Sequence, residues 1–447
     1  MFRSLKVQLL LVLVLAVGFF AGCGKKSDET AVKPGQIPIK VAFWGAVEEK
    51  GIITDTVRRW EKDHPNIKVI LEHIPSAYTD KVLTEIAGGN PPDIIFAEVN
   101  VFVTFFYKNA LLDLTPYLKK DKEFKISNFF SEVVSRFTRK GKVFCIPRDT
   151  APFACVYYNK ALFKEMGVPL PKDSWNLNEF LDTAKKLTVD ESGKHPGEPG
   201  FNEKKIKTYG YWGWSWQNFV YAHGGGLVDD INNPKICTMN SKEAVEGIQY
   251  SVDLSYKHFV SPKPDSLSNM GMSINQLFSM GRLAMFQSGI WETPNLRRVI
   301  GKKFDWDVAM FPKGPKGKRA FGTGGSGYAI MNMCKNPDAA WEVVKCLAGD
   351  YGQETLADTG LAQPANKLIA KGIHWEQDTK NVPLNKGMLN EAVKYVVYDP
   401  FHIRWREAWD RYVVPQMDLI NNQRVTVKEG VDKIVAKVNP LLKEDSK

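Results

Sequence analysis

Aromatic residues gather in one short stretch of the sequence. YGYWGWSWQ, residues 209–217, holds two tyrosines and three tryptophans. Such a stretch can form a core ridge, a membrane-interface girdle, a platform for nucleobases or a wall for sugar rings, because these rings combine a large apolar face with a polar edge. Trp216 shares a helical face with apolar residues, so we expect it in the core. Trp214, and after it Trp212, remain as candidate ligand-binding residues.

Other candidate residues stand at the ends of apolar runs. Trp44 and Glu48 follow IPIKVAF, and Glu98 ends DIIFAE. A tryptophan can stack on the C–H face of a sugar, and a carboxylate can accept two hydroxyl groups in charge-assisted hydrogen bonds. An alternative interpretation stays open for each residue. In it, Trp44 packs on the next helix, and Glu98 serves only to stabilise the start of a helix. Arg404 and Trp405, in FHIRWREAW, suit either a cleft wall or a helix surface.

These residues are positioned by alternating strand-like and helix-like segments. Strands are expected at 37–45, 66–74 and 93–99, with helices at 48–65 and 77–92 between them. This alternation predicts an α/β fold with a parallel, doubly wound sheet. The apolar run 101–118 is expected to form one further helix. Residues 148–152 then form a short polar link, which predicts a crossover between two lobes.

Helix starts are marked by capping residues. Asn240 is followed three residues later by Glu243, and Thr426 by Glu429. Both spacings predict a capping box. Asn336 precedes a proline, which suits an N-cap followed by the first helical turn.

The N-terminus has the features of a secretory signal peptide. Two early cations precede an apolar run at 7–20, which is shorter than the ~20 residues of a spanning helix, and small residues follow it. We expect a signal peptide at 1–22, a lipidated Cys23 and a flexible tether at 23–36. The mature chain is then extracytoplasmic and anchored to a bacterial membrane, at the cell surface or in the periplasm.

Composition narrows the function classes. The formal net charge is +10, but the lysines are scattered without an arginine-rich cluster, so no nucleic acid is expected as a partner. The cysteines show no CxxC or Cys/His ligand spacing, so no metal site is expected. The loop GTGGSG, residues 322–327, matches the dinucleotide-binding pattern G-x-G-x-x-G, but an expected strand follows it instead of a helix. No cofactor is expected.

Several ordered segments resemble family 1 extracellular solute-binding proteins, the carbohydrate-binding components of bacterial ABC importers. The matching segments are NPPDIIF, GKVFCIPRD, VYYNKALFKEMG, FSMGRLAMFQSGIW and WDVAMFPKGPKGKRAFGTGGSGYAIMNM. The resemblance implies a two-lobe, type II periplasmic-binding-protein-like fold with hinge strands and a ligand cleft between the lobes. Lobe 1 is expected at 37–149 and 305–350, and lobe 2 at 150–304 and 351–447.

The same resemblance implies roles for further residues. Trp291 stands where family members stack a tryptophan on the sugar, and Asp149 where they often place an acid. The alternative for Asp149 is hydrogen bonding within the hinge. Gly325 and Ser326 are expected to offer backbone donors to the ligand, because glycine permits close approach.

The sequence therefore predicts a solute receptor that is not an enzyme. It binds a sugar, with a di- or oligosaccharide favoured, and acts as a monomer that docks on the transmembrane subunits of an ABC permease. A lipid-anchored glycoside hydrolase is the first alternative, and it would need two carboxyl groups about 5–10 Å apart. The second alternative keeps the fold and changes the solute.

Overall fold

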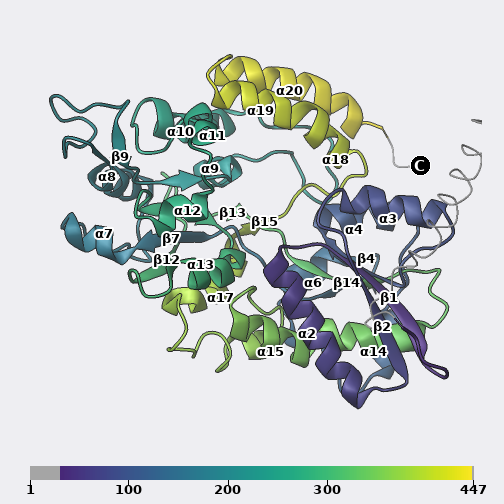
Figure 1. The fold of residues 1–447 in the computed structure, drawn as a ribbon. Helices are drawn as coiled ribbons and strands as arrows, with labels where there is room; N and C mark the ends of the chain where they lie inside the picture. Colours follow the sequence, from purple (N-terminus) through teal and green to yellow (C-terminus); the bar gives the residue numbers. More distant parts are fainter. Residues whose placement is uncertain (1–30, 445–447) are drawn as a thin grey trace, which may run out of the picture.

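The first lobe is built on a sheet whose strands alternate with helices, as the sequence predicts. The computed structural model describes residues 31–444 (Figure 1). Its first elements are β1 (Ile37–Phe43), α2 (Val47–Asp63), β2 (Ile67–His73), α3 (Tyr78–Ala87) and β3 (Ile94–Glu98). Strand β1 lies between β2 and β3 and runs parallel to both. In β3 every residue except Glu98 is buried, because helices cover both faces of this sheet.

The first sheet is completed by two strands that belong to later parts of the chain. The strand order is β2-β1-β3-β14-β6, with β6 at Ile146–Pro147 and β14 at Ser326–Ile330. Strand β14 is antiparallel to both of its neighbours. The chain leaves the sheet after β6 and re-enters it beside that point, so the returning strand must run in the opposite direction.

The second lobe contains a mixed sheet of four strands in the order β10-β11-β7-β12. Its strands are β7 (Cys155–Asn159), β10 (Trp212–Gly213), β11 (Met285–Ser288) and β12 (Trp306–Met310). Strand β7 is antiparallel to β11 and β12, whereas β10 is parallel to β11. All residues of β7 and β12 are buried. The fold is therefore two α/β lobes, each with its own sheet and core.

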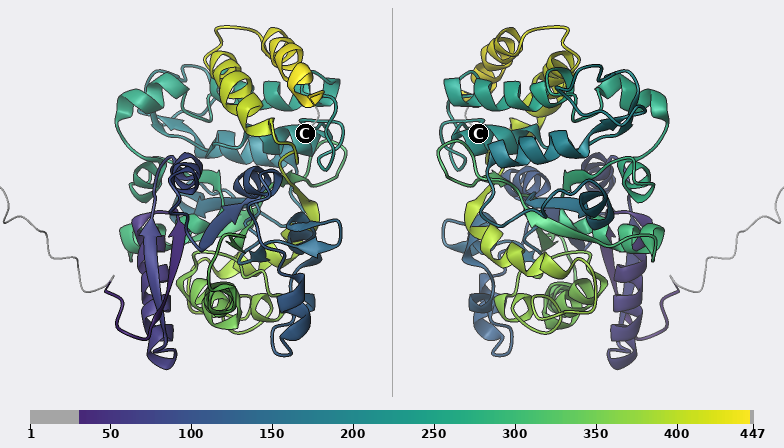
Figure 2. Two further views of the ribbon diagram at one scale, coloured as in Figure 1. Left: turned by 90° about the vertical axis from the view of Figure 1, so that its right-hand side faces the viewer. Right: turned by 90° about the vertical axis from the view of Figure 1, so that its left-hand side faces the viewer.

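A third apolar cluster joins the C-terminal helices to the second lobe. Helices α9 (Trp216–His223), α10 (Lys242–Tyr256) and α20 (Val427–Leu442) supply most of it. The C-terminal helices lie on the outer side of the second lobe in both views of Figure 2. Thr426 and Glu429 form the predicted capping box. The predicted box at Asn240 is wrong: Ser241 caps α10, and the side chain of Asn240 donates to Asp432 instead.

The remaining elements connect and cover these sheets. One expected helix, 101–118, is two helices, because Asn109 adopts a positive φ of 53° that ends the first of them. Asn336 occupies the expected N-cap position before a proline, although its side chain makes no capping bond. The other helices are α4 (Val99–Tyr107), α5 (Thr115–Lys120), α6 (Ser131–Arg136), α7 (Lys160–Glu165), α8 (Leu177–Leu187), α11 (Pro264–Met270), α12 (Ile274–Ser279), α13 (Thr293–Ile300), α14 (Pro337–Ala348), α15 (Asp350–Thr359), α16 (Lys367–Ala370), α17 (Leu389–Ala392), α18 (Trp405–Ala408) and α19 (Val414–Asn421). The short strands are β4 (Thr138–Arg139), β5 (Lys142–Val143), β8 (Val189–Asp190), β9 (Ile206–Thr208), β13 (Phe321–Gly322) and β15 (Val396–Val397).

Three segments run side by side where the lobes meet. Residues 148–153 carry the chain from the first lobe to the second, and residues 321–326 carry it back. The two are joined by hydrogen bonds from Phe153 N to Gly322 O, 2.8 Å, and from Arg148 N to Ser326 O, 2.7 Å. Strand β15 pairs with β13 and forms the third segment. The predicted crossover after β6 is therefore observed.

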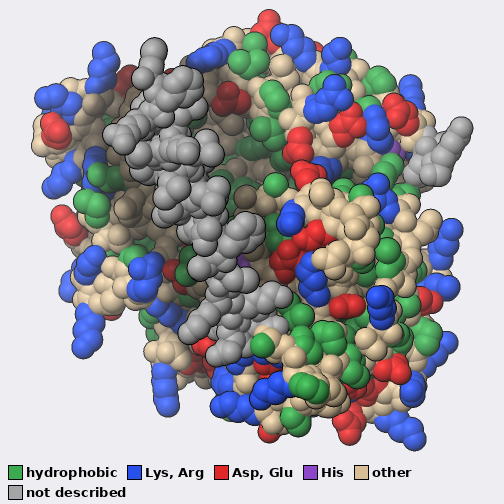
Figure 3. All heavy atoms as spheres, turned by 45° about the vertical axis from the view of Figure 1, so that its right-hand side comes forward, with side chains coloured by type: hydrophobic (Ala, Val, Ile, Leu, Met, Phe, Trp, Pro, Cys, Tyr) green, Lys and Arg blue, Asp and Glu red, His purple; other side chains and the backbone are tan. Residues whose placement is uncertain are grey.

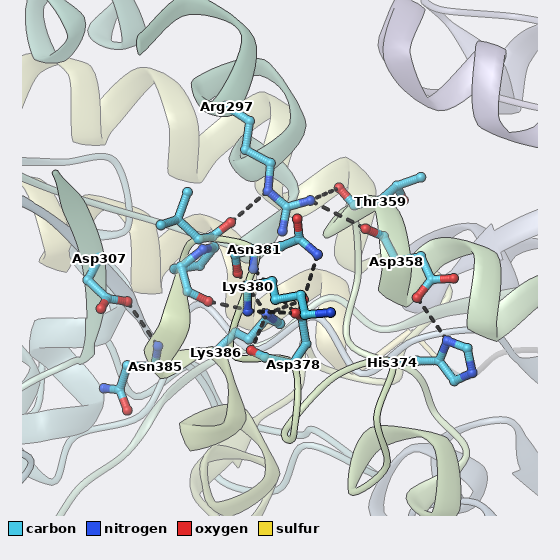
Figure 4. A network of polar contacts seen from close by, with 12 residues as sticks. Arg297, Asp307, Asp358, Thr359, His374, Asp378, Lys380, Asn381, Asn385 and Lys386 are labelled. Atoms are coloured by element: carbon cyan, nitrogen blue, oxygen red, sulfur yellow. Dashed lines mark hydrogen bonds and ion pairs between the residues drawn. The ribbon is translucent and has the colours of Figure 1, made fainter. Parts of the chain in front are cut away.

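The chain between α15 and β15 packs against both lobes. It contributes Ala365 and Val393 to the first core and Trp375 to the second. Figure 4 shows how α13 is tied to this stretch and to the end of α15: Arg297 donates to Val382 O at 2.6 Å and to Thr359 O at 2.8 Å. In the same network Lys386, which is fully buried, forms an ion pair of 2.9 Å with Asp378. This stretch therefore bridges the two cores.

Candidate functional site

A cavity of about 680 Å³ lies between the lobes. Its wall combines the end of β1, the end of β3, the two crossing segments and the β11–α13 connection. Eight residues proposed from the sequence line it together: Trp44, Glu48, Glu98, Asp149, Trp214, Trp291, Gly325 and Ser326. They come from both lobes and from the segments that connect them.

Two exposed tryptophans and a phenylalanine form the aromatic wall on the second lobe. Trp214 is 38% exposed and Trp291 is 36% exposed, which is unusual for such large apolar side chains. Phe153 lies between them, with ring centroids 4.8 Å from Trp214 and 5.9 Å from Trp291, edge to face in both cases. Phe153 was not predicted, because its position in the first crossing segment becomes informative only once the lobes are assembled.

Glycine at position 289 lets one of these tryptophans lie flat against the chain. A methyl group built on Gly289 would stand 1.8 Å from a ring carbon of Trp291. No real contact is that short, so the indole occupies the space that a larger residue would need. The orientation of Trp291 therefore depends on this glycine.

The first lobe presents one tryptophan to the cavity. Trp44 directly follows β1 and is half-buried. Its ring centroid lies 4.2 Å from that of Phe96 and 4.9 Å from that of Tyr78. One side of the indole is thus held by the core of the lobe, while the residue also lines the cavity. Aromatic surface therefore reaches the cavity from both lobes.

A buried ion-pair network holds the base of the cavity. Arg148 Nη1 lies 2.6 Å from Glu49 Oε1, and Arg148 Nη2 lies 2.8 Å from Asp149 Oδ2. Burial alone would lower the pKa of the Arg148 guanidinium, but the two carboxylates raise it above its ordinary value. Arg148 also lies over the ring of Phe96, 4.2 Å from its centroid. Arg148 stays charged and fixes both carboxylates.

Asp149 and Ser326 are engaged with each other. Asp149 Oδ1 accepts the backbone N–H of Ser326 at 3.0 Å, and the Ser326 hydroxyl donates to Oδ2. Both residues line the cavity, but these contacts join the two crossing segments. Asp149 therefore makes the hinge hydrogen bonds that were the alternative to a ligand-binding role. The backbone N–H of Ser326 donates to Asp149 instead of to a ligand. Gly325, with a φ of +70°, is the residue at which the segment turns.

Glu98 differs from Glu48, Glu49 and Asp149 because it has no counter-ion at contact distance among residues 31–444. It precedes α4, yet its side chain makes no capping bond to that helix. Burial raises its pKa to about 7, with further contributions from the negative charges of Asp399 and Asp149, while Arg406 acts in the opposite direction. A half-buried carboxyl group of this kind can either donate or accept hydrogen bonds near neutral pH.

Glu292 is a further carboxylate that the sequence analysis missed. Its Oε2 accepts from Asn275 Nδ2 at 2.8 Å, and its Oε1 accepts from the Ser288 hydroxyl at 3.1 Å. The indole N–H of Trp214 reaches the same Ser288 hydroxyl at 3.4 Å. Glu292 directly follows Trp291 in the sequence, and that adjacency was the signal that could have found it.

Comparison with known proteins decides the family. The family described as "Bacterial extracellular solute-binding protein" matches residues 40–354. The chain belongs to this family. It is 23% identical over 355 residues to an arabinooligosaccharide-binding protein of Halalkalibacterium halodurans, which covers 77% of this chain and 72% of the relative.

Solved structures with the same fold are also similar to this solute-binding protein. An ABC substrate-binding protein from Listeria monocytogenes in complex with cycloalternan superposes with a TM-score of 0.78 at 24% identity, over 91% of this chain and 98% of the other. Maltose-bound MalE3 of T. maritima superposes with a TM-score of 0.75 at 20% identity, over 90% and 99%. The two-lobe binding-protein fold expected from the sequence is confirmed.

Three predicted residues of the solute-binding protein lie outside the main cavity. Trp212 lines an adjoining cavity of about 370 Å³ instead. The expectation that Arg404 and Trp405 line the cleft is corrected by the structure. Trp405 is 2% exposed and packs in the third apolar cluster, and Arg404 forms ion pairs with Glu407 and Glu444. Helix α18 therefore uses its aromatic side chain to join the C-terminal helices to the lobe.

Residues 31–444 offer neither a metal-binding cluster nor a membrane-spanning helix. No three His, Cys, Asp or Glu side chains in this range are grouped so that they could hold a metal ion. None of its helices has the length and apolar character needed to cross a bilayer. The predicted signal peptide and Cys23 lie outside the described residues. On the face seen in Figure 3, Lys and Arg side chains are interspersed with Asp and Glu.

Proposed function

We propose that this protein is the sugar receptor of an ABC import system, with a di- or oligosaccharide as its ligand. It acts as a monomer, closes its two lobes on the sugar and presents it to the transmembrane subunits of a permease. A lipid on Cys23 holds it to the outer side of a bacterial membrane. The ligand leaves the receptor chemically unchanged.

The observation that carries this proposal is the pairing of aromatic surface from both lobes around hydrogen-bonding carboxylates. Trp44 lines the cavity from the first lobe, while Trp214 and Trp291 line it from the second. Glu98 and Glu292, which have no cation at contact distance in the described part of the chain, stand in the same cavity. A sugar presents apolar C–H faces and hydroxyl edges, so it matches this combination. The relatives that bind arabino-oligosaccharides, maltose and cycloalternan support the same ligand class.

Calorimetry and thermal unfolding of the purified mature protein with a panel of glycans test the proposal. A ligand at 100 times its Kd stabilises the folded state by about 2.7 kcal/mol. Trp291→Ala should lower that stabilisation to about 1.4 kcal/mol or less, because a ligand that binds at least tenfold more weakly is then present at no more than about 10 times its Kd. Tyr351→Ala is the matched control, because Tyr351 is 38% exposed, close to the 36% of Trp291, and lies on α15 outside the cavity lining. Stabilisation by ions or amines, with none by any glycan, would refute a sugar ligand.

The carboxylates of the cavity also allow the alternative of a glycoside hydrolase, so turnover must be measured directly. The glycan that stabilises the protein is incubated with it and analysed by chromatography. We expect the glycan to be recovered intact at every time point. Accumulation of shorter products that disappears in Glu98→Gln or Glu292→Gln would show an enzyme instead of a receptor.

The lipid anchor is tested separately in the cell. Cys23→Ser should move the protein from the membrane fraction to the soluble extracytoplasmic fraction while leaving sugar binding by the purified protein unchanged. Retention of the Cys23→Ser variant in the membrane fraction would argue against lipidation at this residue.

A further inference from the structure

We propose that the ligand is an oligosaccharide that spans two cavities and places an additional sugar unit in a side chamber of the second lobe. This inference rests on the proposed sugar-receptor function and specifies the length of its ligand. The side chamber is the adjoining cavity of about 370 Å³, lined by Trp212, Trp214, Ser273, Ile274, Asn275, Phe286, Ser288, Trp291 and Glu292.

The side chamber adjoins the main cavity. Four residues line both of them: Trp214, Asn275, Trp291 and Glu292. The two exposed tryptophans therefore border both spaces. A ligand held beside them in the main cavity lies next to the chamber, so the occupant that we propose is a further unit of the same molecule.

The lining of the chamber has the two chemical components that a sugar unit needs. Trp212, Ile274 and Phe286 supply apolar surface. Phe286 is fixed, because it is buried and its ring stacks on Tyr157 with centroids 4.7 Å apart and an interplanar angle of 8°. Ser273, which also lines the chamber, is exposed and is the N-cap of α12, where its hydroxyl oxygen accepts the backbone N–H of Gln276 at 3.2 Å. A preformed apolar surface with polar groups at its edge is typical of small-molecule sites.

A polar group stands at the boundary of the two cavities. Each oxygen of the Glu292 carboxylate accepts one hydrogen bond, from Asn275 and from Ser288. An ionised carboxylate can accept about four. Glu292 therefore keeps acceptor capacity for ligand hydroxyl groups at the point where a chain of sugars passes from one cavity to the other, and Asn275 holds the carboxylate in that orientation.

A substitution that fills the chamber distinguishes its contribution to ligand affinity from that of the main cavity. Ile274 lines only the chamber and is half-buried at the first position of α12. Ile274→Trp should occupy the chamber while leaving the main-cavity residues that the chamber does not share, among them Trp44 and Glu98, in place. Met280→Trp is the matched control, since Met280 follows the same helix, is 60% exposed and lines neither cavity. Ile274→Phe is a smaller filling variant, in case the tryptophan prevents folding.

The probes are linear malto-, cello-, manno- and arabino-oligosaccharides from the monosaccharide to the pentasaccharide, titrated by calorimetry. In the wild type, the series that binds should gain at least tenfold in affinity at the unit that enters the chamber. Ile274→Trp should remove that gain and leave the affinity for shorter sugars within about twofold, while Met280→Trp retains it. Ile274→Phe should remove part of the gain.

The opposing outcomes distinguish this inference from the proposed function. If both Ile274 variants bind the longer sugars as the wild type does, or if affinity is independent of ligand length, the side chamber takes no sugar unit although the protein remains a sugar receptor. If the wild type binds no oligosaccharide or monosaccharide, the proposed function itself fails, and this inference fails with it.

Discussion

The carboxylate of Glu48 and the guanidinium of Arg298 meet across the cleft, with Oε1 and Nη2 3.2 Å apart. Glu48 belongs to the first turn of α2 in the first lobe, whereas Arg298 belongs to α13 in the second. Both side chains are partly exposed. This pair forms only when the lobes lie close together, so it favours the closed arrangement over an open one.

Arg298→Ala should therefore weaken ligand affinity modestly. An exposed ion pair contributes about 0.2–1 kcal/mol, so the expected loss is at most about fivefold, and it should diminish as the salt concentration rises. Calorimetric titration at low and high salt measures it. Arg411→Ala is the matched control, because Arg411 pairs with Glu407 four residues away on the same lobe. An unchanged affinity at low salt would show that the pair does not contribute to closure.

Gly289→Ala tests the placement of Trp291. The added methyl group would overlap the indole, so the ring must move out of its position in the cavity wall. We expect at least a tenfold loss of sugar affinity, similar to that of Trp291→Ala, with a melting temperature within a few degrees of the wild type. Gly281→Ala serves as the control, since a methyl group there meets no atom within 4 Å, although its φ of +70° adds local strain. Wild-type affinity in Gly289→Ala would contradict the proposed role.

The sequence could predict the residues at strand ends and could not predict those placed by long-range contacts. Trp44, Glu98 and Trp291 lie where apolar runs stop, and the ends of strands in open α/β sheets face the ligand crevice. Asn275 and Phe153 reach the cavity only because β7 pairs with β11, about 130 residues later in the chain. That pairing leaves no local pattern in the sequence.

The same difference between local sequence pattern and tertiary packing explains two predictions that were wrong. Trp405 is aromatic and follows Arg404, a pair that suits a cleft wall as well as a helix surface, but the packing of α18 against α20 buries it. The Asn240 capping box fitted the spacing rule, yet Ser241 is one residue closer to the helix and takes the capping position. Local patterns identify candidate residues, and tertiary packing then selects among them.

Arg148→Ala should strongly destabilise the protein. Arg148 is 5% exposed and Asp149 is 2% exposed, and the substitution leaves Asp149 and Glu49 without their cation. Removing one partner of a buried ion pair costs about 3–5 kcal/mol. Chemical denaturation should show a decrease of that size in the free energy of unfolding, whereas Arg298→Ala changes it by less than about 1 kcal/mol. A small effect at Arg148 would mean that water or relaxation compensates both carboxylates.

Glu98 should make stability depend on pH. Its folded-state pKa, about 7, lies above the usual value of the free side chain, so the folded protein binds more protons than the unfolded chain between these two values. The free energy of unfolding contributed by this group therefore falls as pH rises from about 4.5 to 7, by about 1.4 kcal/mol for each unit of pKa shift. Glu98→Gln should remove that slope and be the more stable form above pH 7. Parallel pH profiles for the two proteins would contradict the assignment.

The aromatic stretch at 209–217 contains a matched pair of tryptophans with opposite roles. Trp214 is 38% exposed in the cavity wall, whereas Trp216 is 9% exposed and stacks on Trp409 with an interplanar angle of 6°. Trp214→Ala should lower sugar affinity at least tenfold, which is about 1.4 kcal/mol, and leave unfolding nearly unchanged. Trp216→Ala should reduce the free energy of unfolding by about 3–5 kcal/mol. Calorimetry and denaturation of both variants measure the two effects, and a loss of stability in Trp214→Ala comparable to that of Trp216→Ala would show that Trp214 is a core residue.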